Sequence, residues 1–207
     1  MIKEKGRATR SDKKHDIKPT IPIKLKETIY RLSYITDKPV KDVGVYFCEA
    51  GIISPKNIEY MSQFFKRDIW LRNTLYRGNL ENISVQSLDP GGKKERITLR
   101  FSQQSYENIR RLAYTLDVTS SKATGFLLDV SIRDADLVNK FVRDYISKNV
   151  NQARMKELKE ILIFINNNNP YEEEISWVTL LSFLYEEMKE GTINLNNSFS
   201  KWLNSFK

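Results

Sequence analysis

Residues 96–101, "RITLRF", alternate between polar and apolar side chains before the period changes. Strict alternation predicts a half-buried β-strand, because successive side chains of a strand point to opposite faces. The apolar set, which should face a core, is Ile97, Leu99 and Phe101. The outward set is Arg96, Thr98 and Arg100. We therefore expect a short strand with one buried face and one basic face.

An amphipathic helix should follow this strand at once. Ser102 is a good N-cap residue, and apolar positions then recur every three or four residues. These positions are Tyr106, Ile109, Leu112, Ala113 and Leu116. A second helix is predicted over "SSKATGFLLDVSI", after a tight turn. Residues 95–133 are thus predicted to form strand, helix, turn and helix.

Residues 15–52 are predicted to be a second copy of this unit. At an offset of 80 residues, identical residues occur at five positions, which are Ile29, Arg31, Leu32, Tyr34 and Asp37 in the first copy. With one inserted residue the offset becomes 81, and Lys41 and Gly44 then fall on Lys122 and Gly125. A glycine inside a helix costs roughly 1 kcal/mol relative to alanine. We expect these two glycines to permit a close helix approach at a pseudo-twofold axis.

One such unit cannot be stable alone, because a lone strand leaves its backbone groups unpaired and about 38 residues bury too little surface. Two copies solve this together if their strands pair antiparallel into a ribbon over four helices. At the same offset, Ile17 and Ile21 fall on Ile97 and Phe101 and should face inward. The outward set of the first copy is then Asp16, Lys18 and Thr20.

An alternative register of the first strand remains open, because Pro19 would lie in mid-strand and cannot donate a ladder hydrogen bond. In that register the inward set is Ile21, Ile23 and Leu25, and the outward set is Pro22, Lys24 and Lys26. The helical phase of Leu25 with Ile29 favours the first register, in which Pro22 belongs to the first helical turn.

The remaining segments frame the two copies. Residues 1–14 are almost free of apolar side chains and should be a flexible basic arm, and residues 53–94 should be a linker of one or two helices ending in the flexible "DPGG" joint. Ser54 is expected to cap the first of these helices. Residues 134–207 are predicted to be a helical C-terminal region that serves packing, oligomerisation or partner binding.

The pattern of residues 15–52 and 95–133 resembles the ribbon-helix-helix family of DNA-binding proteins (the MetJ/Arc type). Two copies in one chain are similar to the tandem arrangement of TraY-like plasmid transfer proteins. The resemblance implies a mainly α fold, in which two ribbon-helix-helix units share a two-stranded antiparallel β-ribbon. Linker helices and a C-terminal helical region complete it.

A two-stranded ribbon fits the DNA major groove, where every base pair has a distinct pattern of donors and acceptors. Only outward side chains of such a ribbon can reach base edges. The candidate base-contacting residues are therefore Arg96, Thr98, Arg100, Asp16, Lys18 and Thr20. Arginine and lysine suit guanine, threonine suits thymine, and aspartate can accept from cytosine N4.

The first turns of the two second helices offer phosphate sites, because free N–H groups and the positive end of the helix dipole lie there. The candidates are Lys38, Val40, Lys41, Thr119, Ser120, Ser121 and Lys122. Such contacts supply affinity and position the protein on the duplex.

Charge and composition agree with a polyanion as partner. The chain has 207 residues, 34 Lys and Arg against 26 Asp and Glu, and a net charge of +8, with the excess concentrated at the N-terminal end. The single cysteine, Cys48, sits in an apolar run and should be buried. No cluster has metal-ligand spacing, and no membrane span or signal peptide is predicted. We expect a cytoplasmic protein that is not an enzyme, without metal or cofactor.

The sequence thus predicts a sequence-specific double-stranded DNA-binding protein, used as a transcriptional repressor or regulator of a plasmid or phage. One alternative is an accessory DNA-binding protein in plasmid transfer, replication or partition. Another is a helical protein-binding adaptor without nucleic-acid binding, which would have no need of arginines on a strand. The partner is predicted to be double-stranded DNA, with no membrane, and a homo-oligomer or protein contact through 134–207 is a further candidate.

Overall fold

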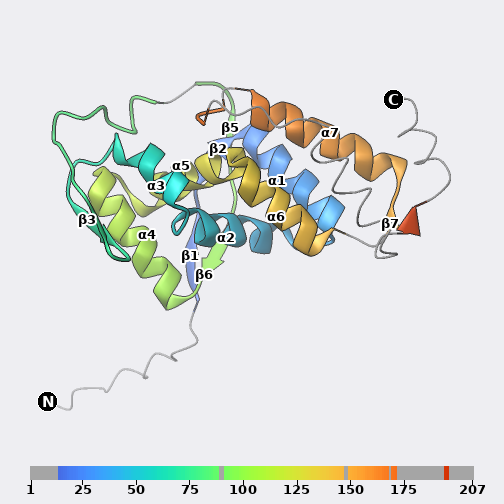
Figure 1. Cartoon of the computed structure of the whole chain (residues 1–207), viewed down its shortest axis with the longest axis horizontal. Coiled ribbons are helices and arrows are strands. Elements are labelled where there is room, and N and C mark those ends of the chain that lie inside the picture. Colours follow the sequence, from blue (N-terminus) through green and yellow to red (C-terminus); the bar gives the residue numbers. More distant parts are fainter. Residues whose placement is uncertain (1–13, 89–90, 147–148, 168, 172–193, 196–207) are drawn as a thin grey trace, which may run out of the picture.

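The computed structural model describes residues 14–88, 91–146, 149–167, 169–171 and 194–195 (Figure 1). Its helices are α1 (Ile23–Thr36), α2 (Val40–Gly51), α3 (Pro55–Ser62), α4 (Gln103–Leu116), α5 (Ser120–Arg133), α6 (Ala135–Tyr145) and α7 (Gln152–Asn166). Its strands are β1 (His15–Ile17), β2 (Thr20–Pro22), β3 (Ile69–Leu71), β4 (Thr74–Tyr76), β5 (Lys94–Arg96), β6 (Leu99–Phe101), β7 (Asn149–Val150) and β8 (Asn194–Leu195). The mainly helical class is confirmed. The predicted arm, except for Lys14, and the C-terminal region beyond Tyr171, except for 194–195, lie outside the described residues.

The predicted pairing of the two strand segments is confirmed. β1 pairs antiparallel with β6, and β2 pairs antiparallel with β5. His15 faces Phe101 and Pro22 faces Lys94, so the two residue numbers of every pair add up to 116. One unbroken register therefore runs through both short sheets, and together they form one ribbon.

Pro19 explains why the ladder divides into two sheets. The Pro19 carbonyl accepts a hydrogen bond of 3.2 Å from the Ile97 N–H, but proline has no N–H to return. The missing bond interrupts the ladder without changing the register. Pro19 is buried between Ile17 and Ile21, so the first register is correct. The alternative register is wrong because helix α1 begins at Ile23.

The first and second helices of the two halves begin 80 residues apart. Helices α1 and α4 have 14 residues each and end in left-handed aspartates, Asp37 and Asp117. The buried positions of α2 also fall on buried positions of α5 at this offset, as the pairs Val43 and Ala123, Phe47 and Leu127, and Cys48 and Leu128 show. The sequence matches of Lys41 with Lys122 and Gly44 with Gly125 predicted one inserted residue in the second copy. The buried positions show instead that α2 and α5 correspond without an insertion.

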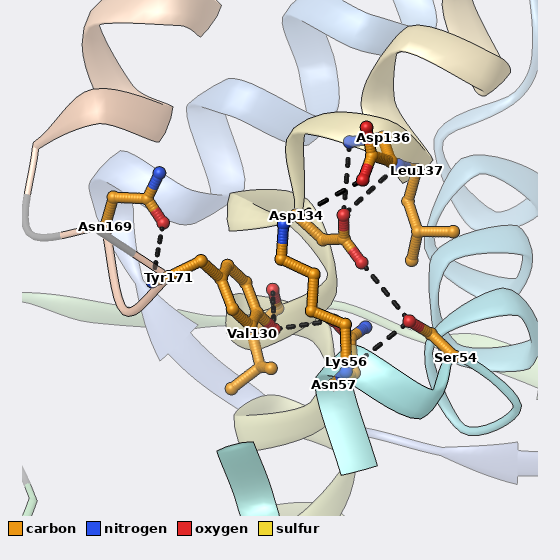
Figure 2. A network of polar contacts seen from close by, with 9 residues as sticks. All are labelled: Ser54, Lys56, Asn57, Val130, Asp134, Asp136, Leu137, Asn169 and Tyr171. Atoms are coloured by element: carbon orange, nitrogen blue, oxygen red, sulfur yellow. Dashed lines mark hydrogen bonds and ion pairs between the residues drawn. The ribbon is translucent and has the colours of Figure 1, made fainter. Parts of the chain in front are cut away.

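Three pairs of equivalent residues mark a pseudo-twofold axis, because a residue on such an axis lies opposite its own equivalent. The register places Lys18 opposite Thr98 in the ribbon. Beneath it, a Cβ added at Gly51 would overlap the Ser131 side chain. Further in, the Ser54 hydroxyl donates to the Asp134 carboxylate at 3.3 Å (Figure 2). Each pair has an offset of 80.

Gly44 and Gly125 were expected to permit a close approach of two helices at the axis, and the structure corrects this expectation. A Cβ at Gly44 would come within 2.5 Å of Leu99 Cδ2, and one at Gly125 would lie 3.5 Å from Ile21 Cγ2. Both glycines thus face the strand of the opposite half. The close approach of the second helices is made at Gly51, on the axis itself.

The first helices leave opposite ends of the ribbon (Figure 1). Ser102 caps α4 by accepting from the Ser105 N–H, and Ser54 caps α3 by accepting from the Asn57 N–H, as predicted. Pro22 differs from expectation. It is the last residue of β2 and the N-cap of α1, with extended backbone angles, so the first helical turn begins one residue later.

Two non-equivalent segments cover the equivalent outer faces of α1 and α4. Helix α7 packs along α1, where Arg31 forms an ion pair of 2.7 Å with Glu157 (Figure 1). The β3–β4 hairpin packs against α4, where Arg111 donates to the Trp70 carbonyl. The repeated arginine therefore anchors a different element in each half.

The linker was predicted to hold one or two helices, and the β3–β4 hairpin stands where the second helix would lie. Of the linker residues that the structure describes, only 55–62 are α-helical, whereas β3 and β4 pair across a two-residue turn at Arg72 and Asn73. Arg72 adopts a left-handed backbone conformation. Gly78 fixes the exit of the hairpin, because a Cβ there would collide with the backbone of Arg67. A short apolar run does not by itself distinguish a strand from a buried helical segment, and here β3 lies against α4.

One continuous core reaches from Ile17 to Ile165. Helices α6 and α7 contribute Phe141, Leu158, Ile161 and other apolar side chains to it. Cys48 is buried among them, as expected, and burial raises the pKa of its thiol. In the described part of the chain, α6 and α7 thus complete the same core as the two halves. None of the described helices has the length and apolar character needed to cross a membrane.

Candidate nucleic-acid interface

The outward face of the ribbon is built from three cross-strand pairs, because residues directly opposite in an antiparallel ladder share a face. These pairs are Asp16 with Arg100, Lys18 with Thr98, and Thr20 with Arg96. All six predicted base-contacting residues are exposed. The inward residues between them are buried against the helices. The structure therefore brings the six predicted residues together on one surface.

These outward pairs occupy the positions where side chains come closest. Hydrogen bonds join Ile97 to Pro19 and Ile23 to Lys93, which are pairs of odd-numbered residues. In an antiparallel ladder, the pairs between them are not hydrogen-bonded and have Cα atoms roughly 1 Å closer than their neighbours. The two outward side chains of each pair are therefore close enough to contact each other across the ribbon.

The charge of this face is positive and uneven. Its six residues include three basic side chains and one acidic side chain, which gives +2. Arg100 Nε lies 3.1 Å from Asp16 Oδ1, and the two side chains are 60% and 42% exposed. Arg96 instead faces the uncharged Thr20. One end of the face is thus neutralised, whereas the other keeps its charge.

The other carboxylate of the ribbon is held away from this face. Glu95 belongs to the odd-numbered, inward series and forms an ion pair of 2.6 Å with Lys26 of α1. The hydrogen bond from Lys26 lowers the pKa of the Glu95 carboxyl, and the same bond raises the pKa of the Lys26 ammonium. The Glu95 charge is therefore compensated on the helix side of the ribbon.

The first turn of α5 lies directly beside the ribbon. Thr119 caps the helix by accepting from the Lys122 N–H at 3.2 Å, and Ser120 is its first residue. The Ser121 hydroxyl donates to the Lys18 carbonyl at 2.9 Å, at the centre of the ribbon. Lys122 lines one small cleft together with Thr20 and other ribbon residues. Of the predicted phosphate residues, this group has the tightest link to the ribbon.

The first turn of α2 lies against β6 on the other side of the axis. Val40 is its first helical residue, and Lys41 is exposed one position further on. Lys38 precedes the helix, with its ammonium 4.4 Å from the ring centroid of Tyr145 in α6. A phosphate contact by Lys38 would therefore compete with this cation–π contact.

Two features of the face were missed from the sequence. Lys94 pairs with Pro22 in the same even-numbered series and lines the cleft beside Lys122. Continuing the alternation back from Arg96 by two residues would have found it. The ion pair of Asp16 with Arg100 was also missed, because it depends on the register between segments about 80 residues apart.

No group of histidine, cysteine, aspartate and glutamate with the arrangement of a metal site occurs within the described ranges. The absence of cofactors stays a prediction. Comparisons with family models, curated proteins and solved structures give no significant match. The function must therefore be inferred from the geometry of the ribbon and its flanking helices.

Proposed function

We propose that this protein binds double-stranded DNA sequence-specifically and reads the major groove with its intramolecular β-ribbon. The observation that carries the proposal is the outward face, where six exposed side chains form three cross-strand pairs with a net charge of +2. A two-stranded ribbon has the width that the major groove admits. A helical adaptor would have no use for such a surface.

Each outward residue type has a base edge that it can recognise. Arg96 and Arg100 can donate in bidentate fashion to guanine O6 and N7, and Lys18 can donate to the same atoms. Thr98 and Thr20 can contact a thymine methyl group or form one hydrogen bond. Good bidentate contacts discriminate against a wrong base by roughly 1–3 kcal/mol each. The face thus has enough donors for specific recognition.

The flanking helices supply phosphate contacts in this proposal. The first turns of α2 and α5 lie beside the ribbon on opposite sides of the axis, and they carry the exposed Lys41 and the half-buried Lys122. Helix N-termini attract phosphate through their free N–H groups and the helix dipole. Contacts of this kind position the ribbon without selecting a sequence.

The biological use that we propose is a transcriptional repressor or regulator of a plasmid or phage. This step rests on the resemblance to ribbon-helix-helix proteins, and on the chemistry of a reading head for one short site. The same chemistry would serve an accessory protein in plasmid transfer, replication or partition. We infer a cytoplasmic location from the same reasoning.

The decisive experiment selects bound duplexes from a random pool with the full chain at two salt concentrations. We expect one short motif to be enriched, one chain bound per site, and affinity that falls steeply with salt as phosphate-bound counterions are released. The double variant Arg96→Ala with Arg100→Ala should lose the motif. The control Arg110→Ala with Lys159→Ala removes the same charge from other exposed positions and should keep it.

If the chain enriches no duplex and binds DNA no better than a neutral protein does, the proposal is wrong and the adaptor alternative gains. A motif that both double variants retain would equally remove the ribbon from base recognition.

A further inference from the structure

The outward face of the ribbon has two flanks, the pair Asp16 and Arg100 on one side of the pseudo-twofold axis and the pair Thr20 and Arg96 on the other. The backbone positions of the two flanks are equivalent, but their side chains differ. The pseudo-twofold axis passes between Lys18 and Thr98, which are equivalent positions at offset 80. It relates Asp16 to Arg96, and Thr20 to Arg100. One flank therefore carries Arg100 with a carboxylate, and the other carries Arg96 with a neutral hydroxyl.

The carboxylate constrains Arg100 in a way that Thr20 does not constrain Arg96. Asp16 Oδ1 engages the Nε of Arg100 at 3.1 Å, which leaves the two terminal amino groups of the guanidinium as donors. Those two groups can together make a bidentate contact with guanine O6 and N7. The ion pair thus holds Arg100 without consuming its reading edge.

The carboxylate also acts on bases within its own reach, because an ionised carboxylate only accepts hydrogen bonds. In the major groove, cytosine N4 and adenine N6 donate, whereas guanine and thymine present acceptors. Asp16 should therefore favour a base with an exocyclic amine and repel one with acceptors at that edge. No group at the equivalent position of the other flank has this preference, since Arg96 is a donor.

We propose that the chain recognises a site with two unlike halves and binds it in one orientation, with Asp16 as the residue that determines the difference. This inference rests on the proposed function and adds the kind of target that the ribbon accepts. A symmetric dimer of one unit would read a palindrome, because its two flanks are identical. Here the duplication has allowed each half-site to be read by its own residues.

The test compares motifs selected from a random duplex pool by three full-length proteins. These are the natural chain, Asp16→Asn, and the matched variant Thr20→Val on the other flank. All four residues of the two flanking pairs are exposed, so neither change disturbs the core. A thermal melt of each protein verifies folding.

The natural chain should select a non-palindromic motif. Asp16→Asn should lower discrimination about tenfold, within the range for one base contact, at positions in one half only. Thr20→Val should change positions in the other half only. Reversing one half of the selected site should weaken binding of the natural chain, because the two halves are not interchangeable.

A palindromic motif for the natural chain would overturn the inference while leaving DNA reading by the ribbon intact. Equal changes in both halves with Asp16→Asn would overturn it as well. Failure to select any motif would instead overturn the proposed function, so the two failures are distinguishable.

Discussion

Gly51 and Ser131 touch where α2 and α5 cross, and they are equivalent positions of the two halves. A Cβ added at Gly51 would overlap Ser131 Oγ and lie 2.9 Å from Ser131 Cβ. Because the two residues meet on the axis, the serine side chain of Ser131 leaves no room for any side chain at position 51. The Ser131 hydroxyl fills the space and donates to the Leu127 carbonyl at 2.6 Å. The two halves can differ here because they belong to one chain and have their own sequences.

Gly51→Ala should therefore destabilise the protein by about 1–3 kcal/mol, the range for overpacking of a well-packed core. Urea denaturation of the natural chain and the variant measures the change. Gly125→Ala is the control, since its Cβ would have an ordinary contact at 3.5 Å and alanine favours helix. Adding Ser131→Gly to Gly51→Ala should restore part of the loss. Equal stability of the two glycine variants would contradict the assigned crossing.

Arg154 and Arg67 hold the ends of the two first helices in equivalent ways. Arg154 lies 2.9 Å from Asp37 and over the ring of Tyr34, and Arg67 lies 2.8 Å from Asp117 and over the ring of Tyr114. The repeated tyrosine and aspartate thus bind an arginine in each half. Both arginines come from segments that follow the second helix of the opposite half.

Arg154→Ala should lower the free energy of unfolding by about 1 kcal/mol, because the partly exposed Asp37 limits the value of the ion pair. A double-mutant cycle with Asp37→Asn, which tolerates the left-handed backbone, isolates the pair. We expect a coupling of about 0.5–1 kcal/mol in urea denaturation. Arg110→Ala with Asp37→Asn should show no coupling. If the coupling between Arg154 and Asp37 is also zero, their ion pair contributes nothing to stability.

Arg100→Ala should cost roughly 1–3 kcal/mol on the selected DNA site and relax the base preference at one position. The reason is that a bidentate donor to a base edge is lost, while most phosphate contacts remain. Competition binding with the selected duplex and single-base variants measures both effects. Equal weakening on every sequence would show that Arg100 contributes charge only.

Lys122→Ala should weaken binding to all duplexes about equally and reduce the salt slope by about one unit. Lys122 lies at the N-terminus of α5, beside the ribbon, where a phosphate is expected. Titrations at several salt concentrations give the slope. Lys159→Ala, which removes an exposed lysine of α7, is the control and should leave the slope unchanged. A loss confined to one sequence would argue for base contact instead.

Asp134 makes stability depend on pH. Burial raises the pKa of its carboxyl, although hydrogen bonds from the Leu137 and Asp136 N–H groups partly oppose the shift (Figure 2). The folded state therefore binds this proton more tightly than the unfolded state. It follows that the contribution of Asp134 to the free energy of unfolding decreases as the pH rises above about 4, the unfolded pKa of aspartate.

Asp134→Asn keeps an N-cap oxygen but does not titrate, so its stability should decline less with pH than that of the natural chain. Thermal melts at a series of pH values test this. Asp42→Asn alters an exposed aspartate in the first turn of α2, away from Asp134, and should keep the natural slope. Asp134→Ala should lose about 1 kcal/mol through the missing cap. Identical pH slopes for the natural chain and Asp134→Asn would remove Asp134 as the source.

The local pattern of residues determined the elements of the ribbon and their faces. Alternation at 96–101 placed Arg96, Thr98 and Arg100 outward, and the same rule extended by the repeat placed Asp16, Lys18 and Thr20 outward. Serine caps and apolar periodicity located the starts of α3 and α4. These features depend on neighbours within one or two turns of chain, which is why the sequence alone predicts them.

Only the tertiary structure decided which residues meet across the halves. The pairing of Asp16 with Arg100, the crossing at Gly51 and the docking of α7 on α1 all join segments about 80 or more residues apart. Residues 69–76 likewise form a hairpin whose strand β3 lies against α4. Local periodicity is silent about such contacts, because they depend on the register and burial that the whole chain reaches together.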